Sequence, residues 1–572
     1  MNDFIPGKNR GLSCALVALT IALVPGAAAA QAVSATQIDA IEKQIQELQG
    51  QLQGLKHELA DTKQKLHESE GAAKRAQTQA QHATQAAAQA QGQAQAVAAS
   101  AAVPVAAIAA PPELPPGPHV VQTRYPAVNP PNPQYPTAFP GDRFGIESAD
   151  RQNSIFLTGR LDFDVGDYLD YHPDSKFASV RDLNSGVNAR RARLGVTGKF
   201  EGDWQYSLIY DFGGSNDEGP GGGTTGGVTS GGIQTALVTY NGLNKGPFPI
   251  AFEIGYMDTY FTLDQSTSSN DIMFTERASI QTVASNIFAN DFRSVAGVRS
   301  NNDRYWAGIY ATGPQSGFVH GAPEQFGAFG RATYQVLQDP NYSLHLGGDV
   351  GGLLKPPTSG GIRTITLSDR PEDRIDTTSI LSTGALGTAA NPVTGAAVYG
   401  AELAGGYESL FGQAEYYHID VDRAGLPTNG FDGAYVEGSW TFTGEHRNYL
   451  PATGAYSGIL PDHPFRPWSG DYGLGAFELA GRWSTIDLND NFQSGLAPAK
   501  GSNAVGGGRQ NIYQVGLNWY PNANMRFMLD YLHGTINKGF STAAGGGITG
   551  TPLGAEIGGN FDGLVLRSQF EF

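Results

Sequence analysis

Apolar and polar residues alternate repeatedly from Ser154 onward, over stretches of about ten positions. In residues 155–165 the odd positions are apolar or glycine, whereas the even positions carry one Phe and otherwise Thr, Arg and Asp. Side chains of a β-strand point alternately to the two faces of a sheet, so the pattern predicts amphipathic strands. The same two-residue period recurs in residues 192–199, 204–212, 477–483 and 513–519.

A soluble β-sandwich alternates in the same way, so other features must distinguish it from a membrane barrel. The polar faces carry Arg and Asp together, as a water-filled lumen does, and several segments end in Trp, Tyr or Phe, as in interfacial girdles. The last strand, 564–572, ends the chain on Phe572. Residues 150–572 give room for about sixteen tilted strands. We therefore predict an all-β fold, a transmembrane antiparallel β-barrel of about 16 strands.

A helical period precedes the barrel. Between residues 38 and 66 the apolar positions are spaced alternately three and four apart, which is the a and d pattern of a coiled coil. Isoleucine at both the a and the d positions in the first turns favours a coiled coil of three helices. We therefore predict a trimeric α-helical coiled coil in residues 31–70, and the alternative is a single amphipathic helix packed on its own domain. The apolar stripe consists of Ile38, Ile41, Ile45, Leu48, Leu52, Leu55, Leu59, Thr62 and Leu66.

Two simpler segments flank this coil. Residues 1–30 have the basic start, uncharged run and small-residue end of a secretory signal peptide, and cleavage after Ala30 would also remove Cys14, the sole cysteine. The uncharged run, 11–24, is shorter than the ~20 residues of a membrane-spanning helix, so a retained anchor is the weaker alternative. Residues 71–149 are predicted to be a linker that is first Ala/Gln-rich and then Pro-rich.

Acidic residues outnumber basic ones in the predicted barrel. The chain has 37 Lys and Arg against 54 Asp and Glu, which gives a net charge of -17. Residues 1–140 hold nine of each sign, so the acidic surplus lies after residue 140. Phosphate backbones need a basic protein face, so we expect no nucleic-acid partner.

The sequence offers no motif for catalysis or for a cofactor. The 11 His residues show no paired spacing for zinc and no placement in a Ser-His-Asp motif. The glycine-rich stretches 213–232 and 506–508 lack the Gly-Lys-Ser/Thr of a phosphate-binding loop and read as external loops. Asp162, Asp164 and Asp167 lack the twelfth-position Glu of a calcium loop. We expect no enzyme activity, no cofactor and no metal.

Arginine dominates the basic residues of the barrel region, with 22 Arg against 6 Lys after residue 140. Guanidinium groups bind carboxylate and phosphate at low hydration cost, so arginines on lumen faces suit a path for anions. The alternation places Arg160, Arg191, Arg193, Arg482, Arg526 and Arg567 on such faces. The alternative is that they pair with lumen acids and leave a lining of little selectivity. The candidate acids are Asp162, Asp164, Asp211, Glu478, Asp530 and Glu571.

Several runs in this region resemble the phosphate-selective porins O and P of Gram-negative outer membranes. They occur in order and together span most of residues 150–572. The resemblance implies a homotrimer of 16-stranded barrels, an inward third loop that narrows each pore, and passive uptake of anions. The runs are Asn188–Arg193, Trp204–Phe212, Tyr407–Tyr417, Gly438–Arg447, Gly475–Ser484, Asp487–Asp490, Gly516–Tyr520 and Met525–Tyr531.

The resemblance also locates the narrowing loop, near residues 256–290. The position of the family's phosphate-binding lysine is Asn270, and an acid, Asp271, stands beside it. Losing a cation and gaining a carboxylate lowers the attraction for anions where the field is focused, which weakens the case for phosphate specificity. Glu276 closes the loop motif with Arg277. The remaining candidate anion contacts are Arg190, Arg191, Arg193, Arg277 and Arg293.

These observations together favour an outer-membrane porin with a modest anion preference, whose N-terminal coil lies in the periplasm. Its expected partners are outer-membrane lipid, two further copies of the chain, and inorganic anions or small solutes. A structural tether is the alternative, in which the coil binds peptidoglycan or a periplasmic partner and the barrel is a plugged anchor.

Overall fold

The computed structural model describes the barrel region of the chain. The predicted signal peptide (1–30), the coiled coil (31–70) and most of the predicted linker (71–149) lie outside the described residues. These are residues 137–138, 144–173, 183–213, 232–243, 246, 248–289, 293–314, 324–339, 341–376, 378–467, 473–493, 503–538 and 559–572.

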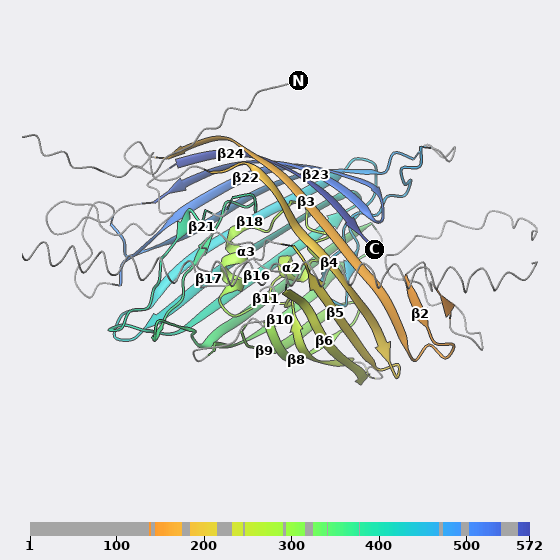
Figure 1. Ribbon diagram of the computed structural model, residues 1–572, viewed down its shortest axis with the longest axis horizontal. Coiled ribbons are helices and arrows are strands. Elements are labelled where there is room, and N and C mark those ends of the chain that lie inside the picture. The colour runs from red at the N-terminus through yellow and green to blue at the C-terminus, as the bar shows by residue number, and fades with distance from the viewer. Residues whose placement is uncertain are drawn as a thin grey trace, which may run out of the picture. The chain divides into compact units, whose positions relative to one another are not determined.

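Sixteen antiparallel strands form a closed ring, which confirms the predicted all-β antiparallel barrel. The first strand of the ring, β3 (Ser154–Pro173), pairs with the last, β24 (Gly559–Glu571), and this pairing closes the barrel (Figure 1). The strands between them are β4 (Gly186–Phe200), β5 (Trp204–Asp211), β6 (Gly232–Leu243), β7 (Ile250–Met257), β8 (Arg293–Asn301), β9 (Tyr305–Thr312), β10 (Phe326–Gln338), β11 (Tyr342–Lys355), β16 (Val393–Tyr407), β17 (Leu410–Arg423), β18 (Asn429–Thr441), β21 (Ala476–Asp490), β22 (Val505–Asn522) and β23 (Met525–Asn537).

Two short strands precede the ring and join the same sheet. β1 (Thr137–Ala138) pairs with β2 (Gly145–Glu147), and β2 pairs with the first residues of β3. Both strands fall within the segment predicted as linker. The sheet therefore begins before the closed ring does.

The two faces of the strands differ as the alternation predicts. On β3, the side chains of Ile155, Leu161 and Phe163 are exposed on the outer face, whereas Asp162 and Asp164 are buried on the inner face. An outer apolar face with a polar inner face suits a barrel surrounded by lipid. Among the described helices, none has the length and apolar character needed to cross a membrane.

Aromatic side chains form a band on the outer surface at the end of the barrel where the connections are short. Trp519 stacks on Phe477 and Phe527, with ring centroids 6.0 Å and 5.5 Å apart. Phe442 continues the band between Phe477 and Trp440. Such rings suit the membrane–water interface, where one end of the side chain is apolar and the other wet.

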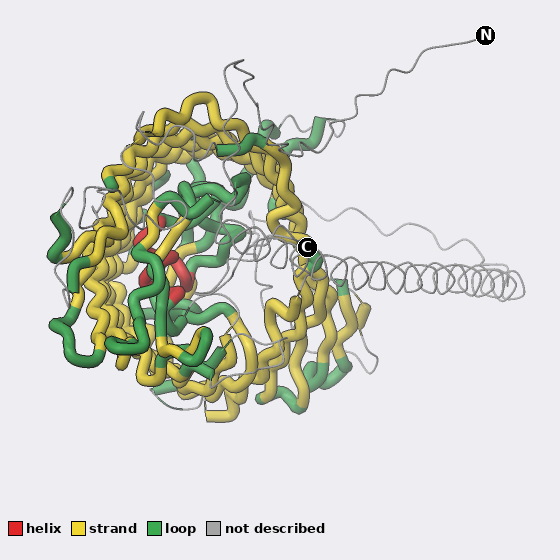
Figure 2. Tube along the Cα trace, turned by 60° about the vertical axis from the view of Figure 1, so that its left-hand side comes forward, coloured by secondary structure: helices red, strands yellow, loops and turns green. Residues whose placement is uncertain are grey.

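In the part of the chain that the structure describes, three connections enter the space inside the ring. The first lies between β7 and β8 and contains α2 (Leu263–Ser266) and α3 (Ser279–Asn286), which lie within the ring in Figure 2. We call its described part, residues 258–289, the constriction loop. The second joins β11 to β16 through β12 (Thr358–Ser359), β13 (Ile362–Arg363), β14 (Ser368–Asp369) and β15 (Leu381–Ser382), and the third joins β18 to β21 through β19 (Tyr449–Leu450) and β20 (Ala455–Tyr456).

The three connections enter from both ends of the barrel. Successive connections of an antiparallel barrel alternate between its ends, so those after β7 and β11 share one end and the one after β18 starts from the other. The end of the β18 connection also carries the short turns at 201–203, 408–409 and 523–524. Outer-membrane barrels have short turns on the periplasmic side.

An apolar core lies between the constriction loop and one half of the inner wall. Residues 279–285 of α3 are all buried. Ile280, Val283 and Ala284 belong to one apolar cluster with inward-facing residues of β8–β11 and β16–β18. Fully buried aromatic residues such as Trp306 and Phe431 are part of this cluster. The loop is therefore packed against the wall rather than suspended in the lumen.

Gly255 allows β7 to approach β6 closely before the chain enters the constriction loop. Its φ of +143° is unfavourable for other residues, and a Cβ atom there would lie 2.1 Å from the carbonyl oxygen of Ala236. We predict that Gly255→Ala lowers the free energy of unfolding by about 1–3 kcal/mol. Denaturant unfolding of the folded barrel in detergent measures this change.

The matched control is Gly481→Ala, because a Cβ atom at Gly481 meets nothing within 4 Å. This control should unfold like the wild type. Equal stability of the two alanine variants would contradict the close approach at Gly255.

Candidate functional site

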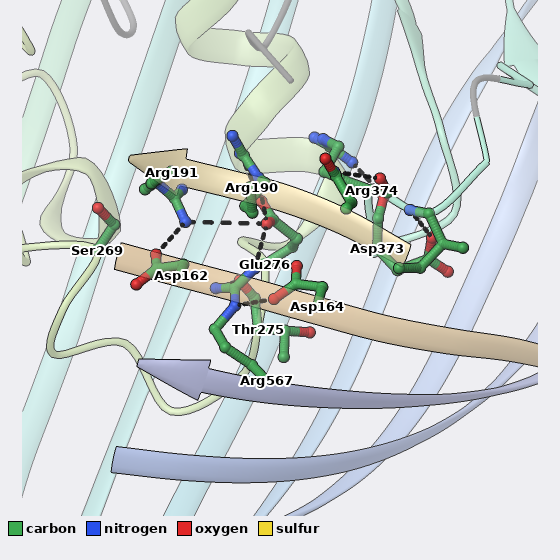
Figure 3. Close-up of polar contacts among 12 residues, drawn as sticks. Asp162, Asp164, Arg190, Arg191, Ser269, Thr275, Glu276, Asp373, Arg374 and Arg567 are labelled. Atoms are coloured by element: carbon green, nitrogen blue, oxygen red, sulfur yellow. Dashed lines mark hydrogen bonds and ion pairs between the residues drawn. The ribbon is translucent and has the colours of Figure 1, made fainter. Parts of the chain in front are cut away.

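Glu276 of the constriction loop makes a buried ion-pair contact with the barrel wall. Its carboxylate accepts two hydrogen bonds from Arg190 of β4, at 2.6 Å from Nε and 2.9 Å from Nη2. Arg567 of β24 donates from Nη2 at 2.9 Å, and Nη1 of Arg191 lies 4.0 Å away (Figure 3). All four side chains are 4% exposed or less. The loop is thus fastened to two wall strands by one carboxylate.

The charges around Glu276 keep it ionised. Burial alone would raise the pKa of Glu276. The positive charges of Arg190, Arg191 and Arg567 outweigh this effect and hold the pKa well below its usual range. The carboxylate therefore remains a charged partner of the wall throughout the physiological pH range.

Two acids of β3 extend this contact into a network. Asp164 accepts from Nε and Nη2 of Arg567 at 2.6 Å and 2.7 Å. Asp162 accepts from Arg191 at 3.2 Å and from Arg160 at 2.6 Å and 3.1 Å. We call Arg160, Arg190, Arg191, Arg567, Asp162, Asp164 and Glu276 the wall cluster. Its four guanidinium groups face three carboxylates, so most of its charge is compensated internally.

The tip of the constriction loop is bound through its backbone carbonyls. Arg160 donates to Ser269 Oγ at 2.7 Å and to the Ser269 carbonyl at 2.9 Å. The carbonyl of Asn270 accepts from Arg526 and Gln569, both at 3.2 Å. The side-chain amide of Asn270 donates to the carboxylate of Glu571. Asn270 is therefore held against β23 and β24.

The opposite side of the loop rests on Glu415 of β17. Its carboxylate accepts from the backbone N–H groups of Leu263 and Asp264, at 2.8 Å and 3.2 Å, at the start of α2. The hydroxyls of Tyr417 and Tyr435 donate to the same carboxylate, each at 2.6 Å. A carboxylate that satisfies free N–H groups at a helix start fixes that helix in position.

The second inward connection touches both the loop and the wall through Glu372. The carboxylate accepts from the Ser279 N–H at 2.8 Å, at the start of α3, and from Arg482 of β21 at 2.7 Å. Arg482 also donates to the Glu276 carbonyl at 2.9 Å. Further along this connection, Tyr168 of β3 donates to Asp373 at 2.7 Å. Two inward segments and the wall thus form one polar assembly.

The third inward connection is bound by two further arginines. Arg447 pairs with Glu478 of β21, at 2.8 Å and 2.9 Å from Nη2, and also donates to the carbonyl of Asp271. Arg331 of β10 pairs with Glu402 of β16 at 2.6 Å and 2.8 Å. Arg331 also donates to two carbonyls of this connection and to Ser266 of α2.

Three buried acids beneath α2 come close together. Oxygen atoms of Asp349, Glu402 and Glu415 lie within 4.8 Å of one another. Protein donors already occupy two of these carboxylates, since Glu402 accepts from Arg331 and His345 while Glu415 accepts from α2 and two tyrosines. The trio is therefore part of the packing beneath the loop, and we assign it no metal.

The arginines named from the sequence lie in these buried contacts. Arg160, Arg190, Arg191, Arg482, Arg526 and Arg567 are each at most 8% exposed. Arg526 donates to the carbonyls of Asn270 and Met273. Arg193 is less buried and pairs with Asp211 at 2.8 Å. In the loop, Arg277 lies 3.7 Å from Asp264 and donates to the Thr267 carbonyl. Arg293 is not part of the loop but the first residue of β8, from where it donates to the carbonyls of Ala289 and Asn286.

Other acids pair differently from the sequence-based expectation. Glu478 binds Arg447 of the third inward connection, whereas Arg482 on the same strand binds Glu372. Asp530 accepts from the Thr275 N–H at 2.7 Å. Asp271 is buried. The acids thus bind the inward segments as well as neighbouring strands.

Sequence reasoning missed Arg331, Glu372, Glu402, Glu415 and Arg447. Two signals point to Glu372 and Arg447. Residues 368–376 carry six charged side chains between two strands, which is unusual for an exposed glycine-rich loop. The connection 442–475 is long although it starts from the end with short turns.

The inner wall is least covered along β4 and β5. The inward positions of β17, β18, β23 and β24 are buried except at the strand ends, whereas Thr197 and Lys199 of β4 are partly exposed and Gln205 of β5 is exposed. A cavity of about 620 Å³ lies at the short-turn end of β4–β9. Its lining includes Gln205, Asn241, Arg299, Asp203 and Asp303. Water can therefore reach this part of the inner wall.

Comparison with known proteins identifies one family. A model of the phosphate-selective porins O and P matches residues 156–558. A search of curated proteins finds no match.

Three solved structures to which the chain is similar are remote in sequence. OmpT of Vibrio cholerae in its trimer form is 11% identical, with 73% of this chain and 99% of that chain covered and a TM-score of 0.42. The anion-selective porin from Comamonas acidovorans is 12% identical, with 73% and 100% covered and a TM-score of 0.39. The outer membrane channel DcaP of Acinetobacter baumannii is 13% identical, with 75% and 99% covered and a TM-score of 0.40.

We predict that Glu276→Gln destabilises the packed lumen, because it leaves the guanidinium groups of Arg190, Arg191 and Arg567 without their shared counter-charge. Breaking a buried ion pair costs about 3–5 kcal/mol. Denaturant unfolding should show a loss of this size. Glu201→Gln, at an exposed turn, serves as the control and should have wild-type stability. If Glu276→Gln unfolds at the same denaturant concentration as the wild type, the contact between Glu276 and the wall does not stabilise the lumen.

A second prediction concerns pH and the second inward connection. Burial raises the pKa of Asp373 to about 6, although the hydrogen bond from Tyr168 opposes the shift. The unfolded pKa is about 3.9, so the folded state holds the proton more tightly and stability falls as pH rises from about 4 to 6. Asp373→Asn should therefore raise the free energy of unfolding by about 1–3 kcal/mol at pH 7.5 and change it little at pH 4.

Asp376 provides a control of opposite sign. Burial favours its neutral form, but hydrogen bonds from Thr378 and Asn184 outweigh burial and lower its pKa. Its ionised form thus stabilises the fold above the unfolded pKa, so Asp376→Asn should lose stability at pH 7.5 and recover toward the wild type in acid. The same sign for both variants would contradict these assignments.

Proposed function

The chain belongs to the phosphate-selective porin O and P family, and from this premise we propose that it admits small hydrophilic solutes and ions by passive diffusion. Family membership and the barrel fold indicate an outer-membrane protein of a Gram-negative cell, acting as a channel. The observation that carries the proposal is the closed ring of sixteen strands with an apolar outer face and a lumen narrowed by an inward loop.

We propose a weak anion preference without a dedicated phosphate site. The wall cluster has one guanidinium group more than it has carboxylates, which favours anions slightly. Its arginines already bind carboxylates, so phosphate would have to displace a protein acid to gain bidentate contacts. Asn270 supplies no positive charge, and its amide is engaged with Glu571.

On the other side of the loop, Arg331 pairs with Glu402 beside two further buried acids, Asp349 and Glu415. The charge of Arg331 is thus compensated within the protein. A channel with such a lining should discriminate weakly between small ions.

We further propose that the channel is a homotrimer with its N-terminal coil in the periplasm. The Ile-rich heptads of residues 38–66 favour a coiled coil of three helices. β3 starts at the short-turn end of the barrel, which supports a periplasmic entry of the preceding chain. The coil then has access to peptidoglycan or to a periplasmic partner.

Reversal potentials in planar bilayers test the selectivity. With a KCl gradient, the wild type should give stepwise conductance and a small reversal potential on the anion side, with little block by phosphate. Asn270→Lys should move the reversal further toward anions, because it adds a cation at the loop tip. Glu571→Gln, which removes the neighbouring carboxylate, should move it in the same direction.

Two outcomes would contradict the proposal. Absence of stepwise conductance from the folded barrel would refute the porin function and favour the tether. Strong phosphate block of the wild type would show that the engaged arginines still form a phosphate site.

A further inference from the structure

A row of inward-facing side chains crosses β2, β3 and β4 at the short-turn end of the barrel. Glu147 pairs in register with Ser154, and Ser154 pairs with Lys199. Residues opposite one another in neighbouring strands share a face. Ile146 and Ile155 are both exposed on the outer face, so Glu147 and Ser154 point to the inner one.

Glu147 and Lys199, on either side of Ser154, form an ion pair. The Lys199 Nζ atom lies 2.9 Å from the Glu147 Oε1 atom. The backbone N–H of Lys199 donates to Ser154 Oγ at 3.2 Å. The ion pair therefore joins β2 to β4, and the backbone hydrogen bond joins Lys199 to Ser154 of β3.

Water reaches this pair, unlike the wall cluster. The Lys199 side chain is 31% exposed and that of Glu147 18%, whereas the arginines of the wall cluster are at most 7% exposed. Lys199 pairs in register with Gln205, which is exposed and lines the 620 Å³ cavity. Lys199 thus stands beside the water-filled space, where a fixed charge acts on passing ions.

Glu147 comes from outside the closed ring. β24 pairs with β3 only from Arg160 onward, and β2 pairs with β3 at residues 154–156. The backbone carbonyl of Phe144 accepts a hydrogen bond from the Leu157 N–H at 2.7 Å. The aromatic ring of Phe144 packs edge to face on the ring of Phe572, with 5.7 Å between the ring centroids. β2 therefore occupies the edge of β3 that the end of β24 leaves open.

We propose that Lys199 is a selectivity-determining residue at the periplasmic mouth, and that the N-terminal strand β2 regulates it by placing Glu147 against its ammonium group. This inference rests on the proposed porin function. A charge in a narrow mouth changes the local concentration of each ion. Strand β2 thereby links the chain before the barrel to the ion preference of the pore.

The charged residues that line the cavity do not duplicate the role of Lys199. Arg299, which lines the same cavity, is 13% exposed and pairs with Glu253 at 2.9 Å. Asp203 and Asp303 line the cavity and add negative charge. Lys199 supplies a water-accessible positive charge here, and Glu147 sets how much of it passing ions experience.

Reversal potentials of four proteins test this inference: the wild type, Glu147→Gln, Lys199→Gln and the double variant. Glu147→Gln should raise the anion-to-cation permeability ratio about two-fold and Lys199→Gln should lower it about two-fold, the effect of one unit charge about 8 Å away in water that is screened by about 0.15 M salt. The double variant should return close to the wild type. The shifts should shrink at 1 M salt, because the Debye length falls to about 3 Å.

Two controls keep the test decisive. Asp432→Asn removes a carboxylate from the outer face of β18 and should leave the ratio unchanged. Glu147→Cys allows the charge to be changed on an already folded channel, because the sequence contains one other cysteine, Cys14 in the predicted signal peptide. A negatively charged thiosulfonate should restore the wild-type ratio, and a positively charged one should raise it further.

Different results would refute this inference and the proposed function. Stepwise conductance with unchanged ratios in both single variants, and no response of Glu147→Cys to either reagent, would overturn the role of Lys199 and Glu147 while leaving the porin intact. Loss of all conductance in the wild type would refute the porin itself.

Discussion

The buried contact between Glu276 and the arginines of β4 and β24 is the interaction on which the interior of this barrel depends. An inward loop carries backbone N–H and C=O groups into a space enclosed by strands, and each needs a partner. The Glu276 carboxylate joins the loop to Arg190 and Arg567 on two wall strands. Glu415 and Glu372 then bind the starts of α2 and α3. Acids and arginines thus hold the loop where apolar packing alone would leave its ends unsatisfied.

This way of holding the loop has a consequence for ion selectivity. An arginine that binds a carboxylate bidentately offers little free charge to a passing anion. Arg190 and Arg567 each bind a carboxylate in this way. Lys199 and its partner Glu147, elsewhere on the inner wall, remain in contact with water. We therefore propose that the charges that hold the loop and the charges that set ion selectivity are separate sets of residues.

The sequence predicted the barrel well because its strands obey a simple rule of alternation. The outer faces of β3 and β24 follow directly from the two-residue period. The same rule placed Arg160 and Arg567 on the inner face, but it carries no information about what covers that face. Acidic partners of the inward-facing arginines come from irregular segments without a period. Glu276 lies 291 positions from Arg567, and Glu372 lies 110 positions from Arg482. Family resemblance located Glu276, whereas Glu372 had no such guide.

The central claim is that the Glu276 contact holds the constriction loop in the lumen and so sets the pore size. Single-channel recording of Glu276→Gln beside the wild type tests it most directly. Loss of the shared counter-charge should free the loop, so the variant should show a larger and noisier conductance while the strands remain closed by the pairing of β3 with β24. A variant whose unit conductance and noise equal those of the wild type would contradict the account.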